Sequence, residues 1–378
     1  MLVTASTFPR WENDTEPRFI LDLCIAMSKY YDVTVLVPSC PGAKDEEIIE
    51  GIRVIRYHYF PLHKWETLCY PGAIVPRIKE KKVRAFLVPF LFFGLRKSLD
   101  KLVNNYEFVH SHWLIPQGIM QFKYDIPYIL TGHGGDVSSL NFWPISILKA
   151  KAINGAKKFT VVSNDLRRIV MNINTNIRPM VISMGCDLKK FSPQNFKENF
   201  FNQGNLPVIL FVGRLAEKKG VEYLIQATKN MNVRLVIVGD GPLREKLVEK
   251  AKKSQCNVDF LGAKSHMELP TIYASADVFV APSIVAKDGD KEGLPTTIIE
   301  AMASGIPTIA SRSGGISEII EHGVNGFLCE EKNIQEIKYY IEKVISDKCS
   351  DIKKNALKTA MEYDYSNIAL KYKNIIDN

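Results

Sequence analysis

The sequence contains no uninterrupted apolar stretch that is long enough to cross a lipid bilayer. Its first residues, MLVTASTFPRW, also lack the basic segment and the cleavage site of a secretory signal peptide. We therefore expect a cytoplasmic protein rather than a secreted or membrane-spanning one. The chain begins in a strand-like segment, so whether Met1 is the true start stays open.

Cysteine is scarce and shows no pattern of pairing. The count is odd, no two cysteines form a CxxC pair, and the chain is large, which together favour reduced thiols in a cytosolic protein. The seven cysteines are Cys24, Cys40, Cys69, Cys186, Cys256, Cys329 and Cys349.

Motifs of metal enzymes and of Ser-His-Asp enzymes are missing as well. There is no HExxH, and Asp288-Gly289-Asp290 is the only candidate for an acidic DxD pair. His110 and His112 project to one face of a strand but lack a third ligand at a useful spacing, so packed or hydrogen-bonded histidines are favoured over zinc. No nucleic-acid recognition motif occurs either. The sequence thus predicts neither a metal centre nor a nucleic-acid partner.

The length and charge of the chain indicate what is present instead. A chain of 378 residues, of which 46% are hydrophobic, is too long for one ordinary core and predicts two domains. The net charge of +8 suits a phosphate-bearing substrate or an anionic membrane face. Scattered surface lysines that only aid solubility remain an equally simple explanation.

Strand-like and helix-like segments alternate along the whole chain, which predicts an α/β protein with parallel sheets covered on both faces. The rhythm pauses after residue 186, so we expect one doubly wound domain over 1–186 and a second over 187–362. The last helix, within 363–378, could pack back on the first domain. The expected strands are Leu2–Ala5, Val33–Val37, Ile52–Tyr59, Phe108–Trp113, Tyr128–Thr131, Phe159–Val162, Val208–Val212, Leu235–Val238, Val258–Leu261, Val278–Ala281 and Thr308–Ala310.

The most informative stretch is KDGDKEGLPTTIIEAMASGIPTIASRSGGISE, residues 287–318. It predicts a loop, a helix over about 294–304, a buried strand and a second helix start. Two carboxylates, Glu292 and Glu300, bracket the first helix start. The junction also offers the backbone N–H groups of Gly293 and Leu294 to a bound anion. N–H donors beside fixed carboxylates suit a phosphorylated sugar.

Cations follow the strand that ends at Val212. Gly213 and Arg214 come directly after it, and Lys218-Lys219-Gly220 precede the next helix. Arginine and lysine at a strand end favour phosphate binding over two merely solvated cations. The nearby GDGPLR turn lacks the third glycine of a dinucleotide fingerprint, so we expect its glycines to be structural. Leu261-Gly262 ends another strand and could meet a base.

The segment Arg77–Leu95 combines five basic residues with an aromatic run. Such a segment can sit on an anionic bilayer, at about 1 kcal/mol for each basic residue near the surface. It can equally be a solvated turn before a core helix, with Phe86, Phe90 and Phe93 packed inward. The two interpretations have equal weight.

The runs FVGRLAEKKG, VGDGPLR, ADVFVAPS and EGLPTTIIEAMASGIPTIAS resemble retaining glycosyltransferases of the GT-B fold, family four (glycosyltransferase group 1). The runs STFPRWENDTEPRF, HSHWLIPQG and THGGD in the first half are similar to the polysaccharide-assembling branches of that family. The resemblance implies two Rossmann-like domains that face each other across a cleft. It also implies a hexosyltransferase-type enzyme (EC 2.4) that moves a sugar from a UDP- or GDP-sugar to a glycan or lipid-linked acceptor, with retention and without a metal.

The resemblance further implies residue roles. His133, Glu292, Arg214 and Lys219 would be catalytic. Glu300 would hold the ribose, and the donor site would comprise Gly213, Arg214, Lys219, Leu261, Gly262, Glu292, Gly293, Leu294, Pro295 and Glu300. The first loop departs from the family, because residues 12–16 replace the usual Gly-Gly pair. This departure favours acceptor-side roles for Arg10 and Trp11, and Asp136 is also expected on the acceptor side.

Four other functions are alternatives to sugar transfer. A nucleotide-sugar epimerase or a sugar phosphorylase would keep the fold and change the reaction. A non-catalytic glycan-binding subunit is disfavoured by the intact set of Arg214, Lys219, Glu292 and Glu300. A dehydrogenase is disfavoured most, because the third glycine is missing. Front-face attack is preferred for the transfer, and a covalent intermediate stays open.

Overall fold

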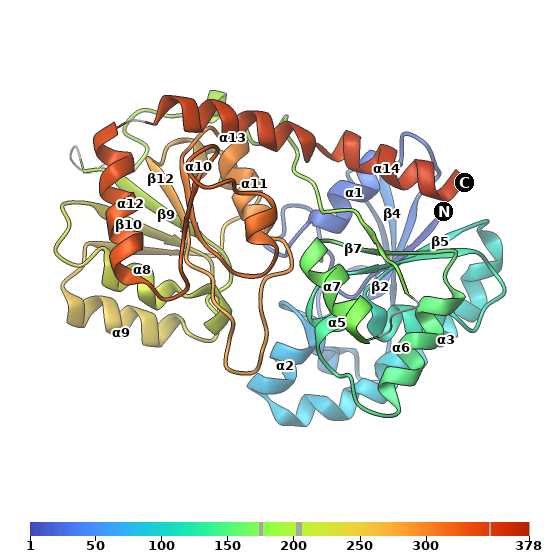
Figure 1. Ribbon diagram of the computed structural model, residues 1–378. Helices are drawn as coiled ribbons and strands as arrows, with labels where there is room; N and C mark the ends of the chain where they lie inside the picture. Colours follow the sequence, from blue (N-terminus) through green and yellow to red (C-terminus); the bar gives the residue numbers. More distant parts are fainter. Residues whose placement is uncertain (174–176, 202–205, 348, 378) are drawn as a thin grey trace. The chain divides into compact units, whose positions relative to one another are not determined.

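The computed structural model describes residues 1–173, 177–201, 206–347 and 349–377 (Figure 1). The chain forms two compact units, one of Met1–Ser183 with Tyr365–Asn378 and the other of Met184–Asp364. We call them unit 1 and unit 2. The sequence-based boundaries were 186/187 and 362/363, and the division between the two compact units lies at 183/184 and 364/365. Among the described residues, no helix has both the length and the apolar character needed to span a bilayer.

Unit 1 is built on an eight-stranded sheet with the order β3-β4-β2-β1-β5-β6-β7-β8. All neighbouring strands are parallel except β3 and β4, which are antiparallel. The strands are β1 (Leu2–Thr4), β2 (Thr34–Pro38), β3 (Glu46–Ile49), β4 (Ile52–Tyr57), β5 (Val109–His112), β6 (Tyr128–Gly132), β7 (Lys158–Val161) and β8 (Met180–Val181).

The hairpin of β3 and β4 was not predicted. Its turn residues Glu50 and Gly51 both have positive φ, as tight hairpin turns require. β3 is an edge strand in which only Ile49 is buried, and the sequence EEII carries little of the apolar alternation that marks a strand. The missed strand is therefore one that buries little apolar surface.

The last helix of the chain, α14, belongs to unit 1. In α14 the Tyr372 ring is fully buried, and its hydroxyl lies 3.3 Å from Thr131 Oγ1 at the end of β6. Tyr365 at the start of α14 donates to the carbonyl of Phe19. The helices are α1 (Phe19–Met27), α2 (Ile74–Glu80), α3 (Val88–Leu102), α4 (Ile119–Gln121), α5 (Gly135–Ser138), α6 (Ile145–Gly155), α7 (Asn164–Ile173) and α14 (Tyr365–Asp377).

The segment Arg77–Leu95 has an inner face and an outer face. Leu87, Leu91 and Leu95 are buried. Phe86 and Phe93, by contrast, are 63% and 67% exposed. Of the three phenylalanines that could have packed inward, only Phe90 is partly covered. The inward interpretation was thus wrong for Phe86 and Phe93, because the leucines on the other face of this segment fill the core positions.

Unit 2 is built on a six-stranded sheet, all parallel, with the order β11-β10-β9-β12-β13-β14. The strands are β9 (Val208–Val212), β10 (Arg234–Val238), β11 (Val258–Gly262), β12 (Val278–Ala281), β13 (Thr308–Ser311) and β14 (Phe327–Cys329). The helices are α8 (Val221–Ala227), α9 (Arg244–Ser254), α10 (Leu269–Ala274), α11 (Thr296–Ala303), α12 (Ile334–Asp347) and α13 (Ser350–Glu362).

The strand order of unit 2 creates a switch point between β9 and β12. From β9 the chain proceeds to β10 and β11 on one side, and it then returns to β12 on the other side. The loops that leave the carboxyl ends of β9 and β12 therefore diverge over opposite faces of the sheet. Ligands of open α/β sheets bind in the crevice that such a divergence leaves. The sheet thus marks the ends of β9 and β12 as the place to look for a site.

Candidate functional site

The loops after β9 and β12 are locked together at this switch point. Gly220, which precedes α8, has φ +61°, and a Cβ there would lie 1.9 Å from the carbonyl oxygen of Pro282. Only glycine permits that approach. The N–H of Ile284 also donates to the carbonyl of Lys218 at 2.8 Å. The glycine that follows the lysine pair is thus required to bring the cationic loop against the loop that leads to Glu292.

Lys219 and Glu292 form the central pair of the site. Lys219 Nζ lies 3.1 Å from Glu292 Oε1, and the two side chains are 15% and 9% exposed. Burial raises the pKa of Glu292, but the charges of Lys219 and Lys218 outweigh burial, so the pKa is below its usual value. Apart from the Lys219 ammonium, no described residue donates a hydrogen bond to Oε1. The site therefore holds a buried, ionised carboxylate oxygen with unused acceptor capacity.

A second cation stands beside this pair. Lys218 Nζ lies 3.2 Å from both carboxylate oxygens of Asp290. Burial lowers the pKa of Lys218, but the carboxylates of Glu292 and Asp290 more than offset this and raise it. Lys218 thus stays charged near neutral pH. The Asp290 carboxylate, which the sequence offered as half of a DxD pair, serves here as a partner of Lys218.

Gly213 and Arg214 lie where β9 ends. Gly213 has φ +156°, and a Cβ there would lie 3.5 Å from Lys219 Cε, so the lysine stem passes beside the glycine. A Cβ on Gly239 would lie 2.0 Å from the carbonyl oxygen of Gly213. The GDGPLR turn therefore packs directly on the Gly213-Arg214 turn, which is a structural reason for its glycines. Leu261 and Gly262 end β11, and the carbonyl of Gly262 accepts the N–H of Gly239 at 2.8 Å.

Glu300 lies one turn into α11 and is separated from Glu292 by the Gly293-Leu294-Pro295 turn. Pro295 is the residue before the helix rather than its first residue. The Glu300 side chain is nearly buried, and its Oε2 accepts the hydroxyl of Tyr273 at 2.8 Å. Burial and the neighbouring Glu300 raise the pKa of Tyr273 well above its usual value, so the phenol remains a donor. Tyr273 was not predicted, because an aromatic residue on α10 gives no signal of this contact.

The loop after β13 packs against the Glu292 turn. A Cβ on Gly314 would lie 2.0 Å from the carbonyl oxygen of Glu292, and the N–H of Gly315 donates to the carbonyl of Gly293 at 3.1 Å. The Ser313 hydroxyl next to them is buried and finds no hydrogen-bond partner among the described residues. Ser313 is a further polar group at this edge that the sequence did not single out.

In unit 1, His133 lies in a cluster of rings after β6. His112 Nδ1 lies 3.0 Å from His133 Nε2, and the His133 ring centroid is 4.6 Å from that of Trp113 and 5.5 Å from that of Phe19. Burial and the neighbouring His110 keep the pKa of His133 well below its usual value. The ring is thus neutral near neutral pH and can donate or accept one hydrogen bond with its remaining nitrogen.

The other two histidines of this cluster are hydrogen-bonded and fully buried, as expected from the sequence. His110 Nε2 lies 2.8 Å from Thr131 Oγ1, and His112 reaches His133. Asp136, which was assigned to the acceptor side, is bonded to backbone groups. Its two carboxylate oxygens accept the backbone N–H groups of His133, Gly134 and Leu114 at 2.8–3.0 Å. These bonds make Asp136 the residue that shapes the His133 loop.

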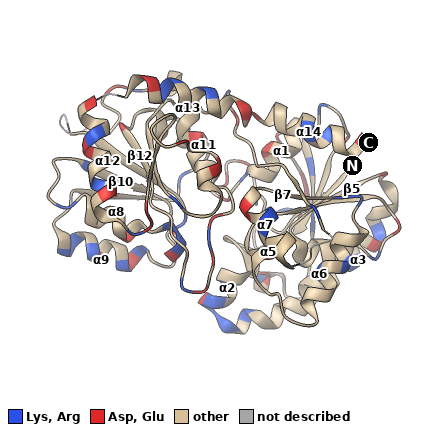
Figure 2. Ribbon diagram, viewed as in Figure 1, with Lys and Arg blue, Asp and Glu red and all other residues tan. Residues whose placement is uncertain are grey.

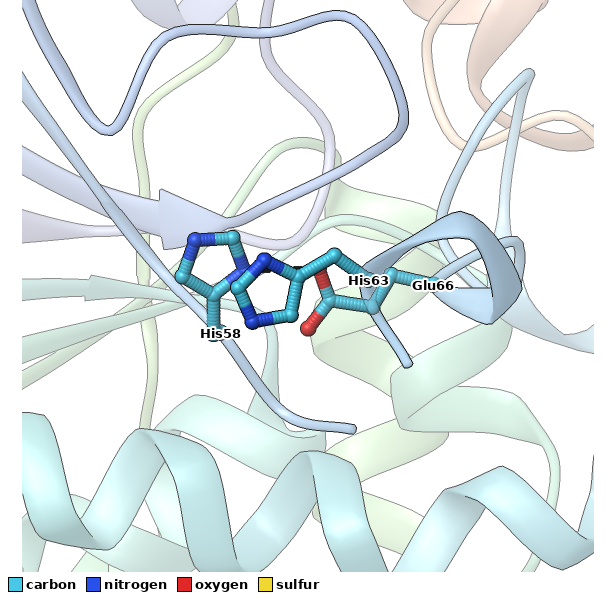
Figure 3. Close-up of side chains that lie close together, drawn as sticks. All are labelled: His58, His63 and Glu66. Carbon is cyan, nitrogen blue, oxygen red and sulfur yellow. Dashed lines mark hydrogen bonds and ion pairs between the residues drawn. The ribbon is translucent and has the colours of Figure 1, made fainter. Parts of the chain in front are cut away.

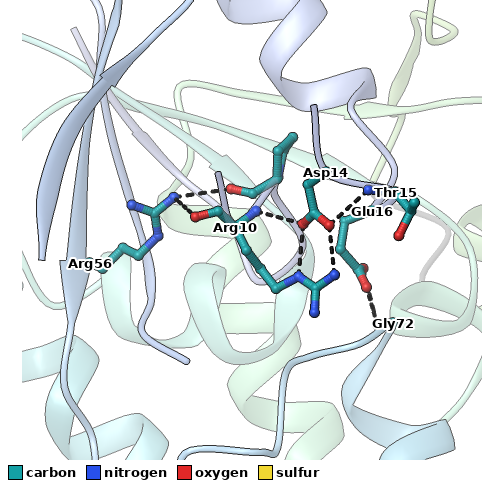
Figure 4. A network of polar contacts seen from close by, with 7 residues as sticks. Arg10, Asp14, Thr15, Glu16, Arg56 and Gly72 are labelled. Atoms are coloured by element: carbon teal, nitrogen blue, oxygen red, sulfur yellow. Dashed lines mark hydrogen bonds and ion pairs between the residues drawn. The ribbon is translucent and has the colours of Figure 1, made fainter. Parts of the chain in front are cut away.

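Polar contacts hold the loop that contains Arg10, and Figure 4 shows them. The Asp14 carboxylate accepts three bonds from Arg10, one from the backbone N–H and two from the guanidinium, at 2.6–2.8 Å. Arg56 donates to the carbonyls of Pro9 and Arg10, and Glu16 accepts the N–H of Gly72. The Arg10 guanidinium also lies 4.4 Å from the Trp11 ring, which is 40% exposed. The loop thus presents an aromatic surface from a fixed backbone.

The comparisons with known proteins agree with this arrangement. The family model described as Glycosyltransferase Family 4 matches residues 17–190, and the model described as Glycosyl transferases group 1 matches residues 193–359. Over 368 residues the chain is 37% identical to the uncharacterized glycosyltransferase MJ1607 of Methanocaldococcus jannaschii, which covers 89% of this chain and 92% of that protein.

Two further likenesses are more distant. The amylovoran biosynthesis glycosyltransferase AmsK of Erwinia amylovora is 34% identical over 173 residues, or 42% of each chain. The crystal structure of Anabaena HepE in complex with UDP and glucose superposes with a TM-score of 0.73 at 21% identity, over 100% of this chain and 99% of that one. With two Rossmann-like units and both family models matched, the chain belongs to the group 1 glycosyltransferases and has their GT-B fold.

Proposed function

We propose that the chain transfers a hexose from a nucleotide diphosphate sugar to a hydroxyl group of a glycan or lipid-linked saccharide, with retention and without a metal. The observation that carries this proposal is the Lys219–Glu292 pair. It combines a cation for phosphate with a buried carboxylate oxygen that, apart from Lys219, has no hydrogen-bond donor among the described residues. A sugar hydroxyl can supply a second donor to this oxygen, which has two lone-pair sites.

The leaving diphosphate would bind to Arg214 and Lys219. Negative charge grows on it as the bond to the anomeric carbon breaks, and fixed cations stabilise that charge without reorganising. The acceptor oxygen forms its bond on the face that the diphosphate leaves, and its proton passes to the leaving phosphate oxygen. With two cations already in place, no divalent ion is needed to hold the charge.

Different segments of the chain would contact the sugar, the ribose and the base of the donor. Glu292 and the Gly293-Leu294-Pro295 backbone would contact the sugar. Glu300, held by Tyr273, would accept the ribose hydroxyls, and the Leu261-Gly262 turn would lie near the base. His133 of unit 1 is proposed to contact the donor sugar, the role that the family resemblance implies for it.

The donor is testable with the purified chain. We expect one nucleotide class, UDP or GDP, to raise Tm across a panel of nucleotide sugars in the presence of EDTA. A ligand at a hundred times its Kd adds about 2.7 kcal/mol to the free energy of unfolding. Donor turnover without any acceptor, or only with added phosphate, would show an epimerase or a phosphorylase instead. A panel in which EDTA removes every shift would contradict metal-independent binding.

The acceptor side is proposed to include Arg10 and Trp11. We expect Trp11→Ala to raise the KM for a saccharide acceptor about fivefold, because an exposed ring contributes about 1 kcal/mol of apolar contact. The KM for the donor should not change. Tyr30→Ala is the matched control, since Tyr30 is 39% exposed and lies between α1 and β2, at the opposite edge of the sheet. Equal effects of the two substitutions would count against the acceptor role.

Peripheral binding to the inner face of the plasma membrane is also proposed. Val83, Phe86 and Phe93 are 75%, 63% and 67% exposed, beside a run of basic residues that Figure 2 shows on and after α2. Lys79, Lys81 and Lys82 are exposed there. Apolar side chains next to lysines match the chemistry of an anionic bilayer surface.

Flotation with liposomes tests this surface. The chain is expected to float with anionic vesicles at low salt and to lose most of that binding in the double variant Val83→Glu, Phe86→Glu. Ile48→Glu changes an equally exposed apolar residue on β3 and should float as the unchanged protein does. Absence of flotation at every lipid charge would remove the proposal.

A further inference from the structure

Two histidines and a glutamate come together on the loop that follows β4 (Figure 3). His58 directly follows the strand, whereas His63 begins a short helical turn and Glu66 ends it. Each offers one ligand atom, and the three atoms lie within 4.8 Å of one another. Nothing in the proposed transfer reaction uses this cluster.

The carboxylate of the cluster is already fixed. The Glu66 side chain is fully buried, and its Oε1 accepts the N–H groups of Tyr59 at 2.6 Å and Phe60 at 3.0 Å. Its Oε2 points to His58 Nδ1 at 2.8 Å. The loop is in turn seated on α3, since a Cβ on Gly94 would lie 2.7 Å from the carbonyl oxygen of His58. One oxygen thus holds the loop, and the other is presented to the histidine.

His58 is oriented from its other side. Its Nε2 lies 2.9 Å from Asp45 Oδ1, in the segment before β3. Histidines that bind metals commonly donate their second ring N–H to a carboxylate, which fixes the tautomer and leaves the first nitrogen free to coordinate. With Nε2–H on Asp45, the nitrogen left to coordinate is Nδ1, the one beside Glu66.

His63 can become the third ligand only if its side chain changes rotamer. Its ring lies on the His58 ring with centroids 3.5 Å apart and planes 12° apart. A metal lies in the plane of each imidazole that binds it, so two parallel rings cannot coordinate one ion. The His63 side chain is exposed, and a change of rotamer is therefore open to it.

We propose that His58 Nδ1, His63 and Glu66 Oε2 bind one divalent transition-metal cation, with zinc as the preferred ion. The proton between His58 Nδ1 and Glu66 is released to solvent when the ion binds. Two imidazoles and one carboxylate suit zinc, whereas magnesium and calcium prefer oxygen ligands. The ion would tie residues 58–66 to β4, whose Arg56 holds the Arg10 loop.

Calorimetric titration of the metal-free full chain with zinc chloride near neutral pH tests the site. One zinc ion per chain is expected, and magnesium chloride should give no binding heat. His63→Ala removes a ligand and should weaken zinc binding more than about 100-fold, since loss of an outer-shell partner alone costs about 10–100-fold. Because His63 is exposed, the Tm of the metal-free variant should equal that of the unchanged chain.

Two further variants make the outcome decisive. His266→Ala removes a partly exposed histidine outside the cluster and should leave zinc binding unchanged. Asp45→Asn should weaken zinc binding without abolishing it, because the Asp45 carboxylate only orients His58. With cobalt in place of zinc, a visible absorption band is expected that His63→Ala removes. No binding by the unchanged chain, or equal affinity in His63→Ala, would overturn the proposal.

Discussion

Replacement of Lys219 by methionine is expected to lower kcat/KM for sugar transfer about 10²–10³-fold. Removing one preorganised contact to a developing negative charge raises a barrier by about 3–4 kcal/mol. Methionine keeps an apolar stem beside Gly213 and removes only the charge. The measurement is release of nucleoside diphosphate with acceptor extracted from the membranes of the producing cells.

The same change leaves Glu292 without its nearest counter-charge, so it should also lower the free energy of unfolding by about 1–3 kcal/mol. The double variant Lys219→Met, Glu292→Gln removes both charges and should regain much of that stability without regaining activity. Lys250→Met breaks the half-exposed Lys250–Glu222 pair of unit 2 and serves as the matched control. If Lys219→Met transferred sugar at the rate of this control, the phosphate role of Lys219 would be wrong.

Replacement of Glu292 by glutamine is expected to lower kcat/KM about 10–100-fold, because a hydrogen bond from a sugar hydroxyl to a charged group contributes about 1.5–3 kcal/mol. Glutamine keeps the shape and one acceptor oxygen but loses the charge that pairs with Lys219. The loss should appear with the full donor, and binding of the free nucleoside diphosphate should change little. Glu222→Gln, on the surface pair with Lys250, is the control for a simple change of net charge.

Much of the proposed donor site could be located from the sequence because its parts are local. The strand that ends at Val212 and the loop that leads to α11 each lie within one short stretch of sequence. In a parallel sheet the carboxyl ends of the strands lie at one edge, so the loops that follow them come together. That Gly220 must be glycine follows only from the structure, since it depends on the carbonyl of Pro282 in another loop.

Contacts that depend on distant packing could not be predicted. The Tyr273–Glu300 bond joins α10 to α11, and neither helix carries a pattern that reports it. The edge strand β3 buries too little apolar surface to be recognised. β14 consists of three buried residues, which is too short for an alternation of apolar and polar residues to show in the sequence.

The histidine cluster on the β4 loop shows the same limit. His58, His63 and Glu66 have no familiar metal spacing, and in sequence they look like a polar loop. Their ligand atoms meet because Glu66 turns back to bond the N–H groups of Tyr59 and Phe60. Asp136, in contrast, was assigned to the acceptor side, but its bonds to the N–H groups of His133, Gly134 and Leu114 could not be predicted, since nothing in the sequence indicates them.

The most direct test of the central claim is a pair of calorimetric titrations in EDTA. The unchanged chain and Glu292→Gln are each titrated with the free nucleoside diphosphate and with the matching nucleotide sugar. We predict that the unchanged chain binds the nucleotide sugar more tightly than the diphosphate, and that Glu292→Gln loses this difference while it still binds the diphosphate. A Glu292→Gln chain that keeps the full preference for the sugar would contradict the account.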